Sequence, residues 1–272
     1  MKKIPPQIVL VTGASSGLGR AAALALVAQG HTVYGTSRRV CDDLKAVKWC
    51  VMDVSNETSV EAVVSSIIAE QGRIDVLVNV AGVGTGGALE LTTKEEYEWT
   101  FNTNVLGILN TCRAVLPHMR QRRMGKIINV SSIAGMVGVP YQGLYSASKF
   151  AVEGLSEAYV LELKTFGIKV CLVEPGDFAT NFTINRSLSQ LTKENADYSE
   201  IYERSMAIIE KSENAGARPE LMARKVCALV NAKNPPFRNL VGPAAQVIPT
   251  KLLAFIPTKL AHYILRNMYA VD

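Results

Sequence analysis

Long apolar runs are missing from this 272-residue sequence. No stretch approaches the roughly 18 uninterrupted apolar residues that a membrane-spanning helix requires. The early apolar run at 8–11 is too short for the core of a secretory signal peptide, and a glycine-rich turn follows it at once. These absences argue against secretion and against an integral membrane protein, so we expect a cytoplasmic location.

Cysteine is scarce, and its arrangement argues against two kinds of site. The five cysteines form an odd set, with no CxxC pair and no spacing typical of metal ligands. Such a set is typical of reduced thiols in a cytosolic protein. The sequence therefore predicts neither a disulfide framework nor a metal centre.

Charge is also sparse, because charged residues make up 19% of the chain and the net charge is only +5. Basic residues occur in short pairs such as Arg122-Arg123, without the long basic stripe that a nucleic-acid groove needs. Nucleic acid is therefore not an expected partner. Hydrophobic residues make up 48%, which is enough for a large core with two faces.

Short apolar runs alternate with helical patterns along most of the chain. The expected strands are 8–11, 32–36, 48–52, 75–80, 126–130 and 168–174. Helical patterns lie between them, including a long one at about 95–123 and another that continues to about 166. This alternation predicts an α/β fold: a doubly wound, mostly parallel sheet of the Rossmann type, in three layers and one domain, 1–272.

A glycine-rich turn joins the first expected strand to the first expected helix. At that position, backbone N–H groups and a helix N-terminus can hold a pyrophosphate. The sequence therefore predicts a dinucleotide-binding turn made of Thr12, Gly13, Ser15, Ser16, Gly17, Leu18 and Gly19.

The end of the second strand indicates which dinucleotide binds. An NAD site usually offers an acidic residue there, whereas this chain has Ser37, Arg38 and Arg39, and a guanidinium suits a 2′-phosphate. We predict NADP(H), with NAD(H) as the alternative if the arginines only face solvent. Further contacts are expected at two later strand ends, from Asp53, Val54, Asn79, Ala81 and Gly82.

The segment 126–149 carries the candidate catalytic groups. Ser132 follows a strand, and Tyr145 and Lys149 are four residues apart, so they share one face of a helix. An ammonium beside a phenol lowers the pKa of the phenol, which would make Tyr145 a usable acid. Asn104 lies in an otherwise apolar helix, and a buried amide needs hydrogen-bond partners.

Taken together, these residues resemble the short-chain dehydrogenase/reductase family, and the hydroxysteroid dehydrogenases and acyl-chain ketoreductases within it. The resemblance covers about residues 7–180. It comprises Thr12-Gly13-x-x-x-Gly17-x-Gly19, Asp53, Asn79-x-Ala81-Gly82, Asn104, Ser132, Tyr145-x-x-x-Lys149, and Pro175-Gly176 with Thr180.

The resemblance implies an oxidoreductase that interconverts a carbonyl and a secondary alcohol by hydride transfer. Tyr145 would be the general acid or base, Ser132 would hold the substrate oxygen, and Lys149 would hold the nicotinamide ribose. Asn104 would orient a water in a proton relay. Pro175, Gly176 and Thr180 would contact the nicotinamide, and a homodimer or homotetramer is expected. The alternative is a non-catalytic regulator or scaffold that binds NADP(H).

Two later segments bear on the substrate. The segment 177–217 covers the substrate in relatives, and it is rich in apolar residues that either line a pocket or pack the segment itself. With the residues before Tyr145, the set is Met136, Val137, Val139, Tyr141, Phe178, Phe182, Ile184, Leu188, Leu191, Tyr198, Tyr202 and Met206. A hydrophobic substrate of the steroid, retinoid or acyl-chain type is therefore expected.

The tail, 244–272, is apolar and weakly basic, and the motif PTKL occurs in it twice. It is expected to form two short helices on the domain surface or at a subunit contact. Peripheral membrane attachment is the alternative, which would fit a lipid substrate.

Overall fold

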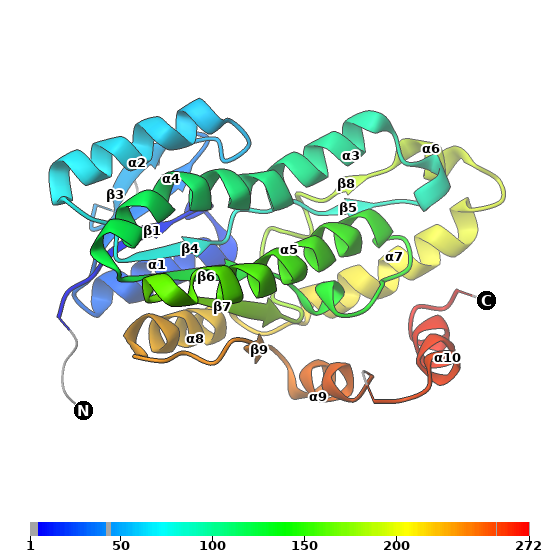
Figure 1. Ribbon diagram of the computed structural model, residues 1–272. Helices are drawn as coiled ribbons and strands as arrows, with labels where there is room; N and C mark the ends of the chain where they lie inside the picture. Colours follow the sequence, from blue (N-terminus) through cyan, green and yellow to red (C-terminus); the bar gives the residue numbers. More distant parts are fainter. Residues whose placement is uncertain (1–4, 42–44, 254, 272) are drawn as a thin grey trace.

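A parallel sheet forms the centre of the computed structural model, which describes residues 5–41, 45–253 and 255–271 (Figure 1). Its strands are β1 (Ile8–Val11), β2 (Thr32–Ser37), β3 (Lys48–Val51), β4 (Val76–Asn79), β6 (Gly125–Val130), β7 (Ile168–Pro175) and β9 (Leu240–Val241). Their order across the sheet is β3-β2-β1-β4-β6-β7-β9, and every pair is parallel. The predicted doubly wound α/β fold is thus confirmed.

The strand order reverses between β1 and β4, where the chain has crossed from one half of the sheet to the other. Loops leave these two strands in opposite directions, so a crevice opens at their carboxyl ends. The residues singled out in the sequence as strand-end contacts are the last residues of strands or lie in the loops that follow them at this edge. The sheet therefore brings together groups that are far apart in the chain.

Alternation along the strands produces two separate cores. In β1, Val9 and Val11 face one core and Ile8 and Leu10 face the other, because successive side chains point to opposite sides of a sheet. Both sets are buried. The sequences of such strands are continuous apolar runs, because helices cover both faces of the sheet.

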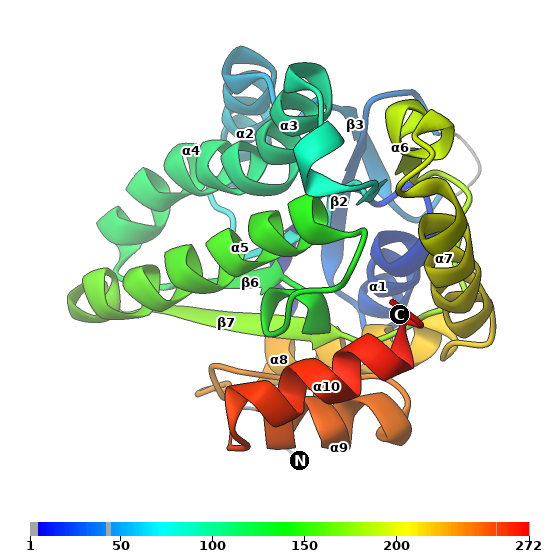
Figure 2. The ribbon, with the colours of Figure 1, turned by 90° about the vertical axis from the view of Figure 1, so that its right-hand side faces the viewer.

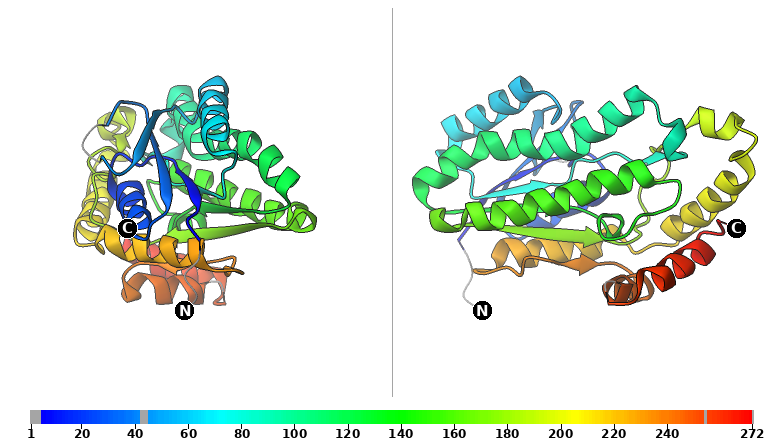
Figure 3. Two further views of the ribbon diagram at one scale, coloured as in Figure 1. Left: turned by 90° about the vertical axis from the view of Figure 1, so that its left-hand side faces the viewer. Right: turned by 45° about the vertical axis from the view of Figure 1, so that its right-hand side comes forward.

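Helices form the two outer layers (Figure 3). They are α1 (Gly17–Ala28), α2 (Glu57–Gln71), α3 (Lys94–Phe101), α4 (Gly107–Arg122), α5 (Gly143–Glu162), α6 (Gln190–Glu194), α7 (Ser199–Asn214), α8 (Pro219–Asn231), α9 (Ala244–Leu253) and α10 (Thr258–Met268). Three short 3₁₀ turns lie at Leu89–Leu91, Ile133–Gly135 and Lys164–Phe166. Helices α1 and α8 cover one face of the sheet, and α2, α4 and α5 cover the other.

The helix expected at about 95–123 is interrupted. A π-helical turn, Asn102–Leu106, separates α3 from α4. Turns of this kind are frequent at functional sites, because the extra residue displaces a side chain from the regular helical pattern. Here the displaced turn contains the fully buried Asn104.

Three short strands were not predicted from periodicity. Strand β9 adds a seventh strand beside β7, and the short strands β5 (Thr85–Gly86) and β8 (Ser187–Leu188) form a separate pair. Two-residue strands carry no usable pattern, so only the packing of distant segments reveals them. The pair attaches the segment 177–217 to the loop after β4.

Helices α9 and α10 lie beyond the carboxyl ends of β7 and β9 (Figure 2). The two predicted helices of the tail are present, although residues 254 and 272 lie outside the described part. The tail is tied to α7, because the hydroxyl of Ser205 donates to the carbonyl of Tyr269 over 2.7 Å and Arg204 donates to the carbonyl of Ala270. No helix in the described residues has both the length and the apolarity needed to cross a bilayer.

Candidate active site

A cavity of about 1570 Å³ opens at the carboxyl edge of the sheet. Most of the predicted site residues form its wall. They are Gly13, Ser15, Ser16, Gly17, Leu18, Gly19, Ser37, Arg38, Arg39, Asp53, Val54, Ala81, Gly82, Ser132, Tyr145, Lys149, Pro175, Gly176 and Thr180. The cavity is large enough for a dinucleotide together with a second ligand, since ordinary ligand pockets occupy about 300 to 1000 Å³.

The glycines of the first turn allow backbone segments to approach each other closely. Gly13 has φ +65°, and a Cβ there would lie 2.8 Å from Cα of Ala81. A Cβ on Gly19 would lie 2.2 Å from the carbonyl oxygen of Gly13. Larger residues would therefore push the start of α1 away from the loop after β4. The open backbone that results fits a pyrophosphate.

Thr12 and Asn79 lie behind this wall and do not line the cavity. The hydroxyl of Thr12 accepts hydrogen bonds from the backbone N–H groups of Val80 and Ala81, at 3.0 and 3.1 Å. The amide of Asn79 donates to Asn129 over 2.9 Å and accepts from Thr111 over 2.8 Å. Both side chains are fully engaged inside the protein, so they position the loops on either side of the switch point.

Opposite the turn, the ends of β2 and β3 form the far wall of the cavity. Arg38 and Arg39 are exposed there, and the backbone N–H of Arg39 donates to the hydroxyl of Ser37 over 3.3 Å. The carboxylate of Asp53 accepts from the backbone and the hydroxyl of Ser55 at 2.9 and 2.7 Å. Two cationic side chains that are free to move thus border a region that fits the adenosine end of a dinucleotide.

Tyr145 and Lys149 occupy the middle of the cavity wall, one turn apart on α5 as predicted. Both are buried, at 8% and 4% exposed. The ammonium of Lys149 lies 5.7 Å from the centre of the Tyr145 ring and donates to the carbonyl of Val130 over 3.1 Å. The two side chains from α5 are therefore held against the end of β6.

The hydroxyls of Ser132 and Ser131 contact different groups. The hydroxyl of Ser132 forms a hydrogen bond with Tyr145 and accepts from the backbone of Ala134 over 3.1 Å. The hydroxyl of Ser131 faces the backbone carbonyl of Lys149, at 3.4 Å. Of the two serines, only Ser132 is directed at the phenol.

Burial reverses the expected pKa of the phenol. Desolvation raises the pKa of Tyr145 to about 12, and the hydrogen bond from Ser132 opposes that rise. Burial also lowers the pKa of Lys149 to about 8, against the opposing effect of the Glu153 carboxylate. The expectation of a phenol made more acidic by its neighbour is wrong for this structure, because both groups are removed from water together.

Asn104 is completely buried and lies next to Lys149. Its side-chain oxygen accepts from the backbone N–H of Val83 over 2.8 Å, and its amide donates to Ser148 over 2.9 Å. A Cβ on Gly82 would lie 3.3 Å from the Asn104 oxygen and 3.5 Å from the Lys149 ammonium. The π-helical turn thus places a fixed amide beside the lysine, behind a glycine.

The loop after β7 closes the cavity on the side of the glycine turn. Thr180 lies against that turn, since a Cβ on Gly17 would be 3.5 Å from the Thr180 side chain. The backbone N–H of Gly176 donates to Val241 over 2.9 Å, which fixes the loop to the short strand β9. Pro175, Gly176 and Thr180 accordingly border the space between the turn and Tyr145.

The apolar residues of 177–217 divide between the two expected roles. Phe178 and Phe182 line the cavity, as do Val137 and Val139 from the preceding loop. The remaining predicted residues do not line it. Tyr202 and Met206 are buried in a third core cluster, and Ile184 and Leu191 are 81% and 50% exposed.

The tail contributes a part of the cavity wall that the sequence analysis missed. Leu260, Ile264 and Met268, spaced four apart on α10, face the cavity together with residues of α9. That spacing is a helical signal that could have been read from the sequence. The substrate end of the cavity is therefore more apolar than the segment 177–217 alone suggests.

Among the residues that the structure describes, no three His, Cys, Asp or Glu side chains stand close enough to hold a metal ion. The polar groups that border the cavity around α5 are the phenol of Tyr145, the ammonium of Lys149 and the hydroxyl of Ser132.

Comparison with known proteins assigns a family. Residues 7–190 match the family model for short chain dehydrogenases. The chain is 54% identical over 266 residues to the 3-ketodihydrosphingosine reductase of Bacteroides thetaiotaomicron, covering 98% of this chain and 99% of that relative.

Two solved structures show the same likeness. A short-chain dehydrogenase from Streptomyces avermitilis superposes with a TM-score of 0.83 at 35% identity, covering 95% of this chain and 96% of the other. ElxO with NADP bound superposes with a TM-score of 0.70 at 30% identity, covering 87% and 97%.

Proposed function

The chain belongs to the short-chain dehydrogenase family, and within it we propose that this oxidoreductase uses NADPH to reduce the ketone of a long-chain, hydrophobic substrate of the 3-ketodihydrosphingosine type. One observation carries the proposal. A single cavity runs from the glycine turn, past the buried Tyr145 and Ser132, to an apolar end. That end is formed by the flap, residues 177–217, and the tail, residues 244–272.

The residues of the chain divide the reaction between them. A bound NADPH supplies the hydride. The Tyr145 hydroxyl donates a proton to the carbonyl oxygen, and the Ser132 hydroxyl donates a hydrogen bond to the same oxygen. Lys149 binds the ribose hydroxyls beside the nicotinamide. Asn104 orients a water that returns a proton from solvent by way of Lys149.

The pKa of Tyr145 favours the reducing direction. A phenol with a pKa of about 12 keeps its proton throughout the neutral range, which is the form that a carbonyl reduction requires. Alcohol oxidation requires the phenolate, which burial disfavours. The protein is therefore poised as a reductase.

Replacing Tyr145 with Phe tests the assignment of the acid. The Phe variant keeps the ring packing but has no proton to donate, so ketone reduction should fall about 100- to 10,000-fold. Binding of NADPH, followed by its fluorescence, should change less than about threefold, because the glycine turn is untouched. Turnover close to that of the wild type would rule out Tyr145 as the proton donor.

The pH dependence tests the raised pKa of Tyr145. Between about pH 6 and about pH 8, reduction should be nearly independent of pH, since the phenol stays protonated. Oxidation of the matching alcohol should rise about tenfold per pH unit, because each unit increases the phenolate fraction tenfold. Initial rates in both directions provide the check, and an oxidation rate that levels off below about pH 7 would contradict the assignment.

The choice of NADP(H) rests on Arg38 and Arg39. A variant with both arginines replaced by Ala should bind NADPH about 100-fold more weakly, since each lost charged hydrogen bond reduces affinity about tenfold. NADH, which has no 2′-phosphate, should bind the variant and the wild type alike. Equal weakening of both cofactors would show that the arginines do not read the phosphate, and would favour NAD(H).

The substrate class follows from the apolar end of the cavity and from the Bacteroides relative. Phe182, Val139, Leu260 and Ile264 are among its lining residues, which suits an alkyl chain better than a sugar or an amino acid. We extend the proposal to the domain organisation: the flap, 177–217, and the tail, 244–272, act with the sheet as a single domain, 1–272, because both line the same cavity.

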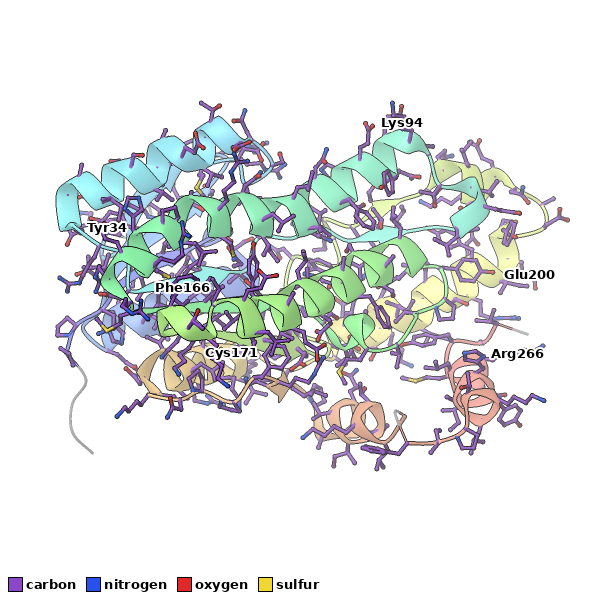
Figure 4. All side chains as sticks on the ribbon, in the orientation of Figure 1. Tyr34, Lys94, Phe166, Cys171, Glu200 and Arg266 are labelled. Atoms are coloured by element: carbon purple, nitrogen blue, oxygen red, sulfur yellow. The ribbon has the colours of Figure 1, made fainter. Side chains whose placement is uncertain are left out.

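We further propose that the tail rests on an anionic membrane surface while the rest of the protein lies in the cytoplasm. Ile248, Phe255 and Tyr263 are 57%, 85% and 66% exposed, and none of them lines the cavity. Residues 244–271 include Lys251, Lys259 and Arg266 but no Asp or Glu (Figure 4). An apolar ridge flanked by cations complements anionic lipid. The five free thiols support a reducing compartment.

Vesicle sedimentation tests the membrane contact. Full-length protein should sediment with vesicles that contain phosphatidylglycerol, and less with phosphatidylcholine alone. A Phe255→Asp, Tyr263→Asp variant should bind at least about tenfold more weakly, because two apolar anchors are lost. Met124→Asp, at a 57% exposed position just before β6 that does not line the cavity, is the control and should bind normally. Unchanged sedimentation of the double variant would contradict the proposal. Dissociation of the double variant from a dimer into monomers would also contradict it, because the two residues would then act in subunit assembly.

We also propose a homodimer or homotetramer. The exposed Phe150 and Leu161 on α5, at 47% and 71%, support a contact between copies on that outer helix layer. Light scattering on the wild type and on Leu161→Asp measures the assembly. A wild-type mass equal to one chain would refute it.

A further inference from the structure

A buried group of charged side chains lies in the flap at the substrate end of the cavity. The guanidinium of Arg186 donates to the carboxylate of Glu213, and the hydroxyl of Thr183 donates to the same carboxylate over 2.6 Å. Arg186 has a side chain that is 0% exposed and Glu213 one that is 11% exposed, and Glu213 lines the cavity. A buried ion pair is costly to form, so its place beside a ligand cavity calls for an explanation.

A continuous chain of contacts joins this group to the phenol. The Phe182 ring lies 5.6 Å from the Tyr145 ring, and the Arg186 guanidinium lies 5.9 Å from the Phe182 ring. Arg186 in turn contacts Glu213. A substrate whose ketone oxygen meets Tyr145 would therefore have its neighbouring carbon atoms close to the charged group.

The group has an excess of negative charge. A second carboxylate, Asp177, also lines the cavity, and it accepts from Ser212 and Gln246 at 2.5 Å each. Two carboxylates thus line the cavity, and only one of them, Glu213, is paired with the guanidinium. The carboxylate of Glu213 still has lone pairs free after its two hydrogen bonds, because an ionised carboxylate offers about four. Such a site attracts a cation.

The guanidinium itself is incompletely satisfied. Within the described residues, Nε and Nη1 of Arg186 are buried and have no hydrogen-bond partner. Buried donors are nearly always paired in native proteins, so two unpaired ones on a single side chain point to a missing oxygen. Arg186 does not itself line the cavity, so a ligand there meets the Glu213 carboxylate while the guanidinium stays behind it.

We propose that Glu213, held by Arg186 and Thr183, binds the protonated amine next to the substrate ketone. The inference rests on the proposed function and deepens it. In 3-ketodihydrosphingosine the carbon beside the ketone carries a primary amine, and the next carbon carries a hydroxyl. The ammonium pairs with Glu213, which lines the cavity, and the alkyl chain runs to the apolar end. The flap thus recognises an amino ketone.

Two matched ketones test the assignment. The probes are 3-ketodihydrosphingosine and the 1-hydroxy-3-ketone of the same chain length without the amine, each reduced with NADPH. The wild type should prefer the amino ketone by about 10- to 100-fold in kcat/KM, the effect expected of one charged hydrogen bond. Glu213→Gln should lose that preference mainly through KM, so that its kcat/KM falls further for the amino ketone than for the ketone without the amine.

The control variant is Glu203→Gln, an exposed position on the same helix that does not line the cavity, and its substrate preference should match that of the wild type. An N-acetylated amino ketone gives an independent test without any mutation, because it keeps the ketone and the alkyl chain but loses the charge of the amine. The wild type should reduce it about 10- to 100-fold less efficiently than the free amine.

The outcomes distinguish a failure of the amine site from a failure of the reductase assignment. Equal losses for both ketones in Glu213→Gln would show that the carboxylate only holds the flap together, and would overturn the amine site. A wild type without preference between the ketones would also overturn it, while leaving the reductase assignment intact. Failure to reduce any of the ketones would overturn the reductase assignment itself.

Discussion

Removal of water from around Tyr145 and Lys149 is the constraint on which the site depends. In water, the ammonium would pull the phenol toward ionisation. Here burial opposes charge on both groups, so the pKa of the phenol rises to about 12 and that of the lysine falls to about 8. In the proposed reduction, the phenol would keep the proton that the carbonyl needs. The pKa values of both groups thus depend on the depth of the site.

That depth comes from parts of the chain with little regular pattern. The π-helical turn brings Asn104 against the loop after β4, where it bonds to Val83. The flap places Phe182 against Tyr145, and the tail supplies a second apolar wall. Each of these excludes water from a different side of the cavity. The same segments border the space proposed for the substrate. They therefore affect both which substrate fits and the pKa of Tyr145.

The division between cofactor end and substrate end is also a division in composition. At the glycine turn, backbone groups approach closely because Gly13 and Gly19 have no side chains. At the flap, bulky apolar residues surround one buried ion pair. A polar, extended ligand fits the first region, and an apolar ligand with a charged head fits the second. The phenol lies between them, where a hydride and a proton can reach the same carbonyl.

Much of the candidate site was predictable because its residues sit at the ends of strongly patterned strands. The apolar runs of β1, β4 and β6 fixed the sheet, and the loops that carry the glycine turn, Asn79 and Ser132 follow directly from them. Thr12 and Asn79 do not line the cavity, and their predicted contact with the dinucleotide stays a prediction. Their side chains turn inward to bond other loops, and no local spacing reveals which way a short polar side chain will turn.

The sequence by itself determined the order of strands and helices, the helical spacing of Tyr145 and Lys149, and the glycine turn, because these depend on neighbouring residues and on periods of two or about four. Only the tertiary structure decided the sign of the Tyr145 pKa shift, the seventh strand, and the meeting of the flap with the tail over one cavity. Those properties depend on how completely distant segments exclude water from each other. Desolvation is a property of the packed molecule, and no short stretch of sequence contains it.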